Sequence, residues 1–277
     1  MQGSIAQTVA LTIYANAALA MRLSPTDFYP SNSTFKFCES VVFSDKRRGP
    51  SESELPPYAS DPVAWIGNLS SEGVSGLRVN YGPLKKRDLV ERTTVAFVGG
   101  GGKWTIEEIR RAKSFTWDGT WRINDRKRAD RRTWQVNYYR TVGSRFRFAY
   151  RPDNLEAHKK KLERSLRRIL NFARNRKLDK FAKVFESGLF RLQSQNPYEG
   201  LFHSDIAPPG FLPLSANQLL GAAQAAWVFG GMGSWNDGMY SGEQDKQYDA
   251  VSQELYGALN ASIIAAANSR LGSALAV

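Results

Sequence analysis

Hydrophobic and polar positions follow different periods along the chain, and these periods predict where helices and strands form. Residues 4–20 are apolar over most of their length and predict an N-terminal helix. Residues 34–44 alternate between apolar and polar side chains, which is typical of a β-strand. Asp61 and Pro62 predict the start of a short helix, because aspartate caps helices and proline fits their first turn.

The stretch from residue 77 to residue 151 predicts an antiparallel β meander, because short alternating segments are separated by turn residues. Strands are expected at 77–81, 93–98, 103–109, 114–117, 120–123, 133–142 and 145–151. Asp118 and Gly119 predict a two-residue hairpin turn, since both turn positions of that geometry need positive φ. Residues 124–132 are highly charged and predict an exposed connection between two strands.

After residue 152 the hydrophobic period becomes helical. Helices are expected at 155–173, 178–192, 215–229 and 246–268. Ser215 and Gln218 predict a capping box for the third of these. The sequence therefore predicts an α+β fold, residues 1–277, in which the meander packs against a mainly helical C-terminal half. If this single domain is subdivided, the boundary is expected at residue 151.

Charge is distributed unevenly along the chain, and this distribution is the most informative feature of the sequence about function. The net charge is +12, yet residues 85–191 hold a large excess of lysine and arginine, whereas residues 192–277 are mildly acidic. A strongly positive segment attracts polyanions. The acidic C-terminal part could also pack against the basic segment. Part of the positive charge would then be compensated within the fold and would not be offered to a ligand.

Basic residues are interleaved with aromatic ones between residues 117 and 140, a combination that suits phosphate contacts together with base stacking. The region 122–183 is therefore predicted to bind nucleic acid or another polyanion. Its candidate binding residues are Arg126, Lys127, Arg128, Arg131, Arg132, Arg145, Arg147, Lys160, Arg164, Arg167 and Arg168. No signature of a known nucleic-acid-binding module accompanies them.

Two loops contain residue types used in catalysis. Candidate functional residues in these loops are His203, Asp205, Trp235, Asn236 and Asp237. Adjacent His and Asp do not make a triad, whose members are usually distant in the chain. The simpler interpretation of 230–238 is a helix stop at Gly230 or Gly231, followed by a turn that buries Trp235.

Other motifs favour no further chemistry. The glycines at 99–102 precede Lys103, but the phosphate-loop pattern fails because Trp104 stands where Ser or Thr is needed. Two histidines and one cysteine in the whole chain supply few soft ligands, so neither a metal site nor a cofactor is predicted. Cys38 lies in an alternating segment and is expected to be a small buried residue.

Three functions remain open at this point. The first is a non-enzymatic basic protein that binds nucleic acid or another polyanion. The second is an inhibitor or immunity-type module that docks an acidic protein, because the same charge steers protein association. The third is an enzyme that uses the loops 203–205 and 230–238. A cytoplasmic location is expected from the single cysteine, and no membrane partner is expected, since no apolar run approaches the ~20 residues of a membrane span.

Overall fold

The computed structural model has an α+β fold built around one five-stranded sheet. It describes residues 1–21, 28–45, 57–83, 91–95, 101–110, 114–142, 153–230, 233–237 and 242–271. The strands are β1 (Cys38–Asp45), β2 (Gly76–Gly82), β3 (Lys103–Ile109), β4 (Phe115–Ile123) and β5 (Trp134–Val142). Their order in the sheet is β1-β5-β4-β3-β2.

The predicted meander is present: β2, β3, β4 and β5 are neighbours in the sheet and run antiparallel to one another. β1 joins the other side of β5 in parallel, which makes the sheet mixed. Residues 145–151, which include the candidate residues Arg145 and Arg147, lie outside the described part of the chain.

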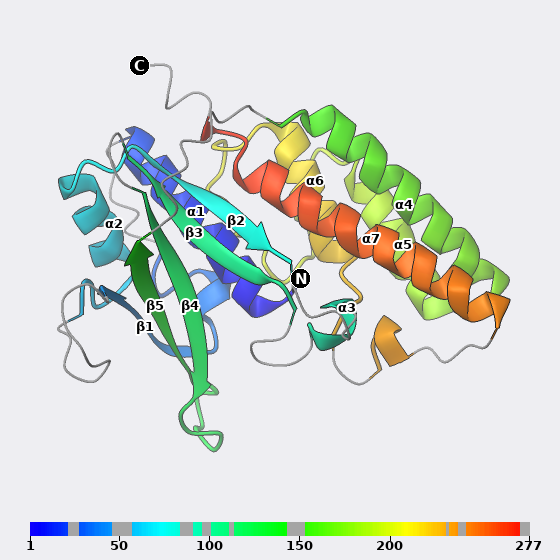
Figure 1. The fold of residues 1–277 in the computed structure, drawn as a ribbon, viewed down its shortest axis with the longest axis horizontal. Helices are drawn as coiled ribbons and strands as arrows, with labels where there is room; N and C mark the ends of the chain where they lie inside the picture. The colour runs from blue at the N-terminus through cyan, green and yellow to red at the C-terminus, as the bar shows by residue number, and fades with distance from the viewer. Residues whose placement is uncertain are drawn as a thin grey trace.

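The longer helices separate into two groups. They are α1 (Gly3–Met21), α2 (Pro62–Ser71), α4 (Leu155–Asn175), α5 (Asp179–Arg191), α6 (Leu214–Ala225) and α7 (Glu243–Ala267). α1 and α2 lie against the sheet, where Tyr138 of β5 donates a hydrogen bond to Gln7 and Trp65 of α2 stacks on Phe43. α4, α5, α6 and α7 pack on one another beside the sheet, and α7 reaches the β2 edge (Figure 1).

The helix predicted at Asp61 is confirmed with its cap. Oδ1 of Asp61 accepts a hydrogen bond from the Ala64 backbone at 2.8 Å, and Pro62 occupies the first turn. The helix ends before Gly73, whose φ of +72° lies in the left-handed region that favours glycine.

The hairpin turn predicted at Asp118 and Gly119 is wrong. Both residues lie inside β4, and Gly119 is directly opposite Tyr138 in β5. A Cβ atom at Gly119 would lie 2.9 Å from the Tyr138 ring, so glycine is needed here to make room for that ring. The connection between β4 and β5 is instead the charged segment 124–133, in which Arg131 adopts a φ of +59°.

Three other expected elements take a different form. Glu91–Thr94 form the short helix α3 at the start of the strand predicted for 93–98. Ser33–Phe35 form a short 3-10 turn, η1, so β1 begins only at Cys38. The capping box at Ser215 is absent, because α6 begins at Leu214 with Pro213 at its N-cap.

Two asparagine side chains complete the outer edge of the sheet. Asn16 of α1 accepts from the Leu77 backbone at 2.7 Å and donates to the Leu77 carbonyl at 2.8 Å. Asn268, the C-cap of α7, makes the same pair of bonds to Val79 at 2.8 and 2.9 Å. All four bonds are buried, so these carboxamides take the place of a neighbouring strand and attach both helix groups to β2.

Replacing Asn268 with alanine should lower the free energy of unfolding by about 2–4 kcal/mol, because the buried N–H and C=O of Val79 lose their partners. Asn171→Ala, at an exposed position of α4, is the matched control and should have little effect. Urea unfolding of both variants measures the difference. Equal stabilities would show that the sheet edge does not depend on this side chain.

Replacing Gly119 with alanine should lower the free energy of unfolding by about 1–3 kcal/mol, because the new methyl group would overlap the Tyr138 ring. Gly67→Ala in α2 is the control: nothing lies within 4 Å of its Cβ position, and alanine favours the helix. Thermal midpoints of the two variants should therefore shift in opposite directions. A neutral Gly119→Ala would contradict this role for the glycine.

Candidate polyanion-binding site

The connection between β4 and β5 carries a group of exposed cations that have no carboxylate partner in the part of the chain that the structure describes. Four side chains on it are exposed and have no described carboxylate within ion-pair distance: Arg126, Lys127, Arg131 and Arg132. The two aspartates of this loop are already engaged. Asp125 accepts from the Lys127 backbone at 2.8 Å, and Asp130 binds the Arg128 guanidinium and the Arg132 backbone. The loop therefore presents a net positive surface.

Arg128 has a different role from its neighbours, because it ties the loop to β1. Its Nη1 lies 2.8 Å from Oε1 of Glu39, and the other oxygen of Glu39 accepts from Asn124 and Gln135. Its hydrogen bond to Asp130 holds the pKa of that carboxyl well below its usual range. Arg128 thus positions the loop rather than offering a free charge.

An exposed aromatic pair lies beside the start of β5. Phe37 and Phe202 are parallel, with their ring centroids 6.2 Å apart, and Lys36 places its ammonium 5.4 Å from the Phe202 centroid. The Phe37 carbonyl accepts from the Trp134 backbone at 3.1 Å, directly after the loop. Neither ring was a predicted site residue: the alternating pattern at 34–44 predicts that Phe37 lies inside a strand, and in the loop after Phe202 only His203 and Asp205 were candidates, for catalysis.

The cations of α4 form a separate group. Arg167 pairs with Glu163 at 2.7 Å, and Arg168 pairs with Glu254 of α7. Lys160 and Arg164 are exposed and have no described carboxylate partner. Figure 1 shows α4 far from the β4–β5 connection, which extends from the opposite end of the sheet. The structure therefore divides the predicted binding residues between two surfaces.

Part of the positive charge is internal to the fold. Arg140 of β5 is wholly buried, and its Nη2 lies 2.7 Å from both Glu72 and Glu108. Burial opposes ionisation of Glu72, but hydrogen bonds from Arg140 and Arg110 lower its pKa to about 2. This cluster compensates its own charges and offers none to a ligand.

His203 and Asp205 meet Ser33, but not in the arrangement of a catalytic triad. Nδ1 of His203 lies 2.9 Å from the Ser33 hydroxyl, and that hydroxyl donates to Asp205. Asp205 also accepts from the Ser33 backbone at 2.7 Å. In a triad the carboxylate orients the imidazole; here it bonds the serine instead. The three residues fasten the 203–205 loop to η1.

No family model matches this chain, and the comparisons with curated proteins and with solved structures found no match either. The function is therefore inferred from the geometry of the candidate sites.

Trp235, Asn236 and Asp237 lie in a 3-10 turn, η3 (Trp235–Asp237), that is bonded to other elements than the 203–205 loop. The Trp235 ring is buried and its Nε1 donates to Ser252 of α7 at 2.7 Å. Asn236 donates to the Arg92 carbonyl at 2.8 Å, and Asp237 accepts from the Gly233 backbone. α6 already ends at Ala225, so Gly230 is not its stop. These side chains close a turn over a buried indole.

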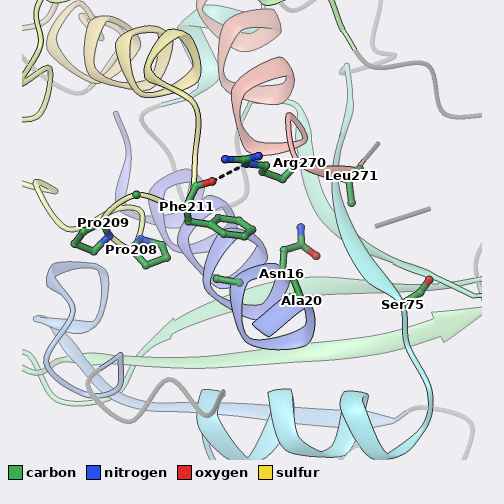
Figure 2. A pocket seen from close by; sticks show the side chains of 10 residues that line it. Asn16, Ala20, Ser75, Pro208, Pro209, Phe211, Arg270 and Leu271 are labelled. Carbon is green, nitrogen blue, oxygen red and sulfur yellow. Dashed lines mark hydrogen bonds between the residues drawn. The ribbon is translucent and has the colours of Figure 1, made fainter. Parts of the chain in front are cut away.

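A cavity of about 390 Å³ opens between the C-terminal ends of α1 and α7 (Figure 2). Its walls are largely apolar, with Pro208, Phe211 and Leu271 among them. The polar side chains that line it are already bonded to the backbone: Nε of Arg270 donates to the Phe211 carbonyl at 2.7 Å, and Asn16 is bonded to Leu77. The cavity therefore offers few free polar groups to orient a ligand.

Two further searches of the described residues bear on function. None of the described helices is long and apolar enough to cross a membrane. Within the same residues, no group of three or more His, Cys, Asp or Glu side chains is arranged to hold a metal ion.

His203 should make stability depend on pH. Burial is the main reason that its pKa falls to about 4 from an ordinary value of 6.5. As the pH falls, the His203 imidazole is therefore protonated in the unfolded chain before it is protonated in the folded protein. The stability that the neutral imidazole contributes above pH 6.5 is lost progressively down to about pH 4.

His203→Asn keeps a donor for the Ser33 hydroxyl but cannot titrate. The variant should lose less stability than the parent over that pH range, as measured by urea unfolding. Parallel pH profiles for the two proteins would show that the imidazole is not the responsible group.

Proposed function

We propose that this protein is a non-enzymatic basic binding protein that engages the phosphate backbone of a nucleic acid through the β4–β5 connection. The observation that carries the proposal is the group of four exposed cations on one loop, Arg126, Lys127, Arg131 and Arg132, without described carboxylate partners. When protein cations bind the phosphates of a nucleic acid, the counterions around those phosphates are released. This release of counterions supplies most of the free energy of non-specific binding.

The loop is also held in place, which favours binding. Glu39 and Asp130 fix Arg128, so the remaining cations project from a connection whose base is bonded to β1. A ligand therefore meets charges whose supporting backbone is already ordered, and less conformational entropy is lost on binding.

The α4 surface is the weaker candidate for the same ligand. Arg167, Arg168 and Arg174 of this helix pair with glutamates, two of which belong to α5 and α7. An acidic protein partner is the main competing interpretation of both surfaces, since charge steers protein association as well. The two interpretations differ in whether a protein-free oligonucleotide binds.

A charge-neutralised loop variant tests the proposal. Arg126→Gln, Lys127→Gln and Arg132→Gln combined remove three cations and leave Arg131, whose positive φ would complicate a substitution. Affinity for a short oligonucleotide should fall. The slope of log affinity against log salt concentration should shrink by about one unit per lost phosphate contact. Fluorescence anisotropy at several salt concentrations measures both quantities.

The matched control is Lys160→Gln, Lys161→Gln and Arg164→Gln on α4, which removes the same charge from exposed positions elsewhere. This variant should bind almost as tightly as the parent. Equal losses in the two triple variants would mean that only net charge matters. A parent protein that binds no oligonucleotide at low salt would overturn the proposal and favour an acidic protein partner.

A further inference from the structure

We propose that the nucleic acid is single-stranded and that its bases stack on Phe37 and Phe202. This inference rests on the proposed function, because the same loop would hold the phosphates. It adds a second contact, the exposed aromatic pair, and with it a class of ligand.

The aromatic pair is unusual in being both exposed and ordered. Phe37 is 41% exposed and Phe202 is 53% exposed, although large aromatic side chains are mostly buried. The two rings are parallel to within 1°, and Lys36 lies over both of them, 5.9 and 5.4 Å from their centroids. The pair therefore offers π-faces and a cation at one place on the surface.

The Phe202 ring is carried by a loop whose backbone is held by hydrogen bonds directly after this residue. The His203 backbone donates to the Gln224 side chain at 2.9 Å, and Gln224 donates back to the His203 carbonyl at 3.2 Å. Asp205 accepts from the Ser33 backbone, and the Asn32 side chain donates to the Asp205 carbonyl at 2.6 Å. The role of the hydrogen bonds made by His203 and Asp205 is therefore to hold the backbone that positions Phe202.

Phe37 and the cationic loop belong to the same end of the sheet. The Phe37 carbonyl is bonded to the backbone of Trp134, and Glu39, two residues after Phe37, binds Arg128 of the loop. Burial raises the pKa of the Cys38 thiol to about 11, and both a hydrogen bond from Gln7 and the charge of Arg132 oppose this rise, which places the Arg132 charge near Cys38. Phosphates on the loop would thus lie near bases at the pair.

Only unpaired bases can use such a surface. In a duplex the base faces are stacked within the helix, whereas a single strand can turn its bases onto aromatic side chains without regard to sequence. Among the residues that the structure describes at this surface, none forms an exposed helix placed for the major groove: Lys36, Phe37 and the loop lie in non-helical segments between strands or before them. The geometry therefore favours single strands over duplex.

The test compares three probes of matched length: oligothymidylate, the same sugar–phosphate chain without bases, and a duplex. The parent should bind oligothymidylate most tightly. Phe37→Ala with Phe202→Ala should weaken that affinity roughly tenfold or more, because the stacked bases lose their aromatic partners, and should leave the abasic affinity unchanged. Phe37→Trp with Phe202→Trp should restore tight binding, because it keeps the π-faces.

Phe190→Ala is the control for surface hydrophobicity, since this ring on α5 is 70% exposed and belongs neither to the aromatic pair nor to the β4–β5 connection. It should bind oligothymidylate like the parent. Equal affinity for oligothymidylate and the abasic chain, or no effect of removing both phenylalanines from a folded protein, would overturn the stacking inference and leave phosphate binding standing. If the parent protein binds none of the three probes, the proposed function is overturned as well.

Discussion

The buried outer edge of β2 is the constraint on which the rest of the structure depends. An edge strand covered by helices has backbone groups that neither water nor a further strand can satisfy. Asn16 and Asn268 solve this by bonding the N–H and C=O of Leu77 and Val79, respectively. Because one asparagine belongs to α1 and the other caps α7, the same four bonds join the sheet to both helix groups.

The function proposed for this fold follows from where its charge remains uncompensated. Arg140 is compensated by Glu72 and Glu108, and three arginines of α4 pair with glutamates of α4 itself, α5 and α7. On the β4–β5 connection the local aspartates are already engaged by Arg128 and by the backbone. Four exposed cations of this connection thus have no described carboxylate partner, and the exposed pair of Phe37 and Phe202 lies at the same end of the sheet.

Prediction from the sequence was most successful where the signal is local. The helix start at Asp61, the strands at 77–81 and 103–109 and the charged connection at 124–132 depend on caps and on hydrophobic period. Gly119 was misread because a turn and a close ring contact both require glycine, and only the position of Tyr138 in the neighbouring strand distinguishes them. The capping box at Ser215 was likewise a local pattern without its structural context.

For the candidate site, the sequence by itself determined the excess of cations, their place in the chain and the α+β class, because charge and period are properties of neighbouring residues. The tertiary structure decided which cations are compensated, since Glu39, Glu254 and Glu186 are brought to their partners from distant segments. It also decided that Phe37 and Phe202 meet on the surface. Contacts between residues far apart in the chain leave no periodic signal, so only packing could reveal them.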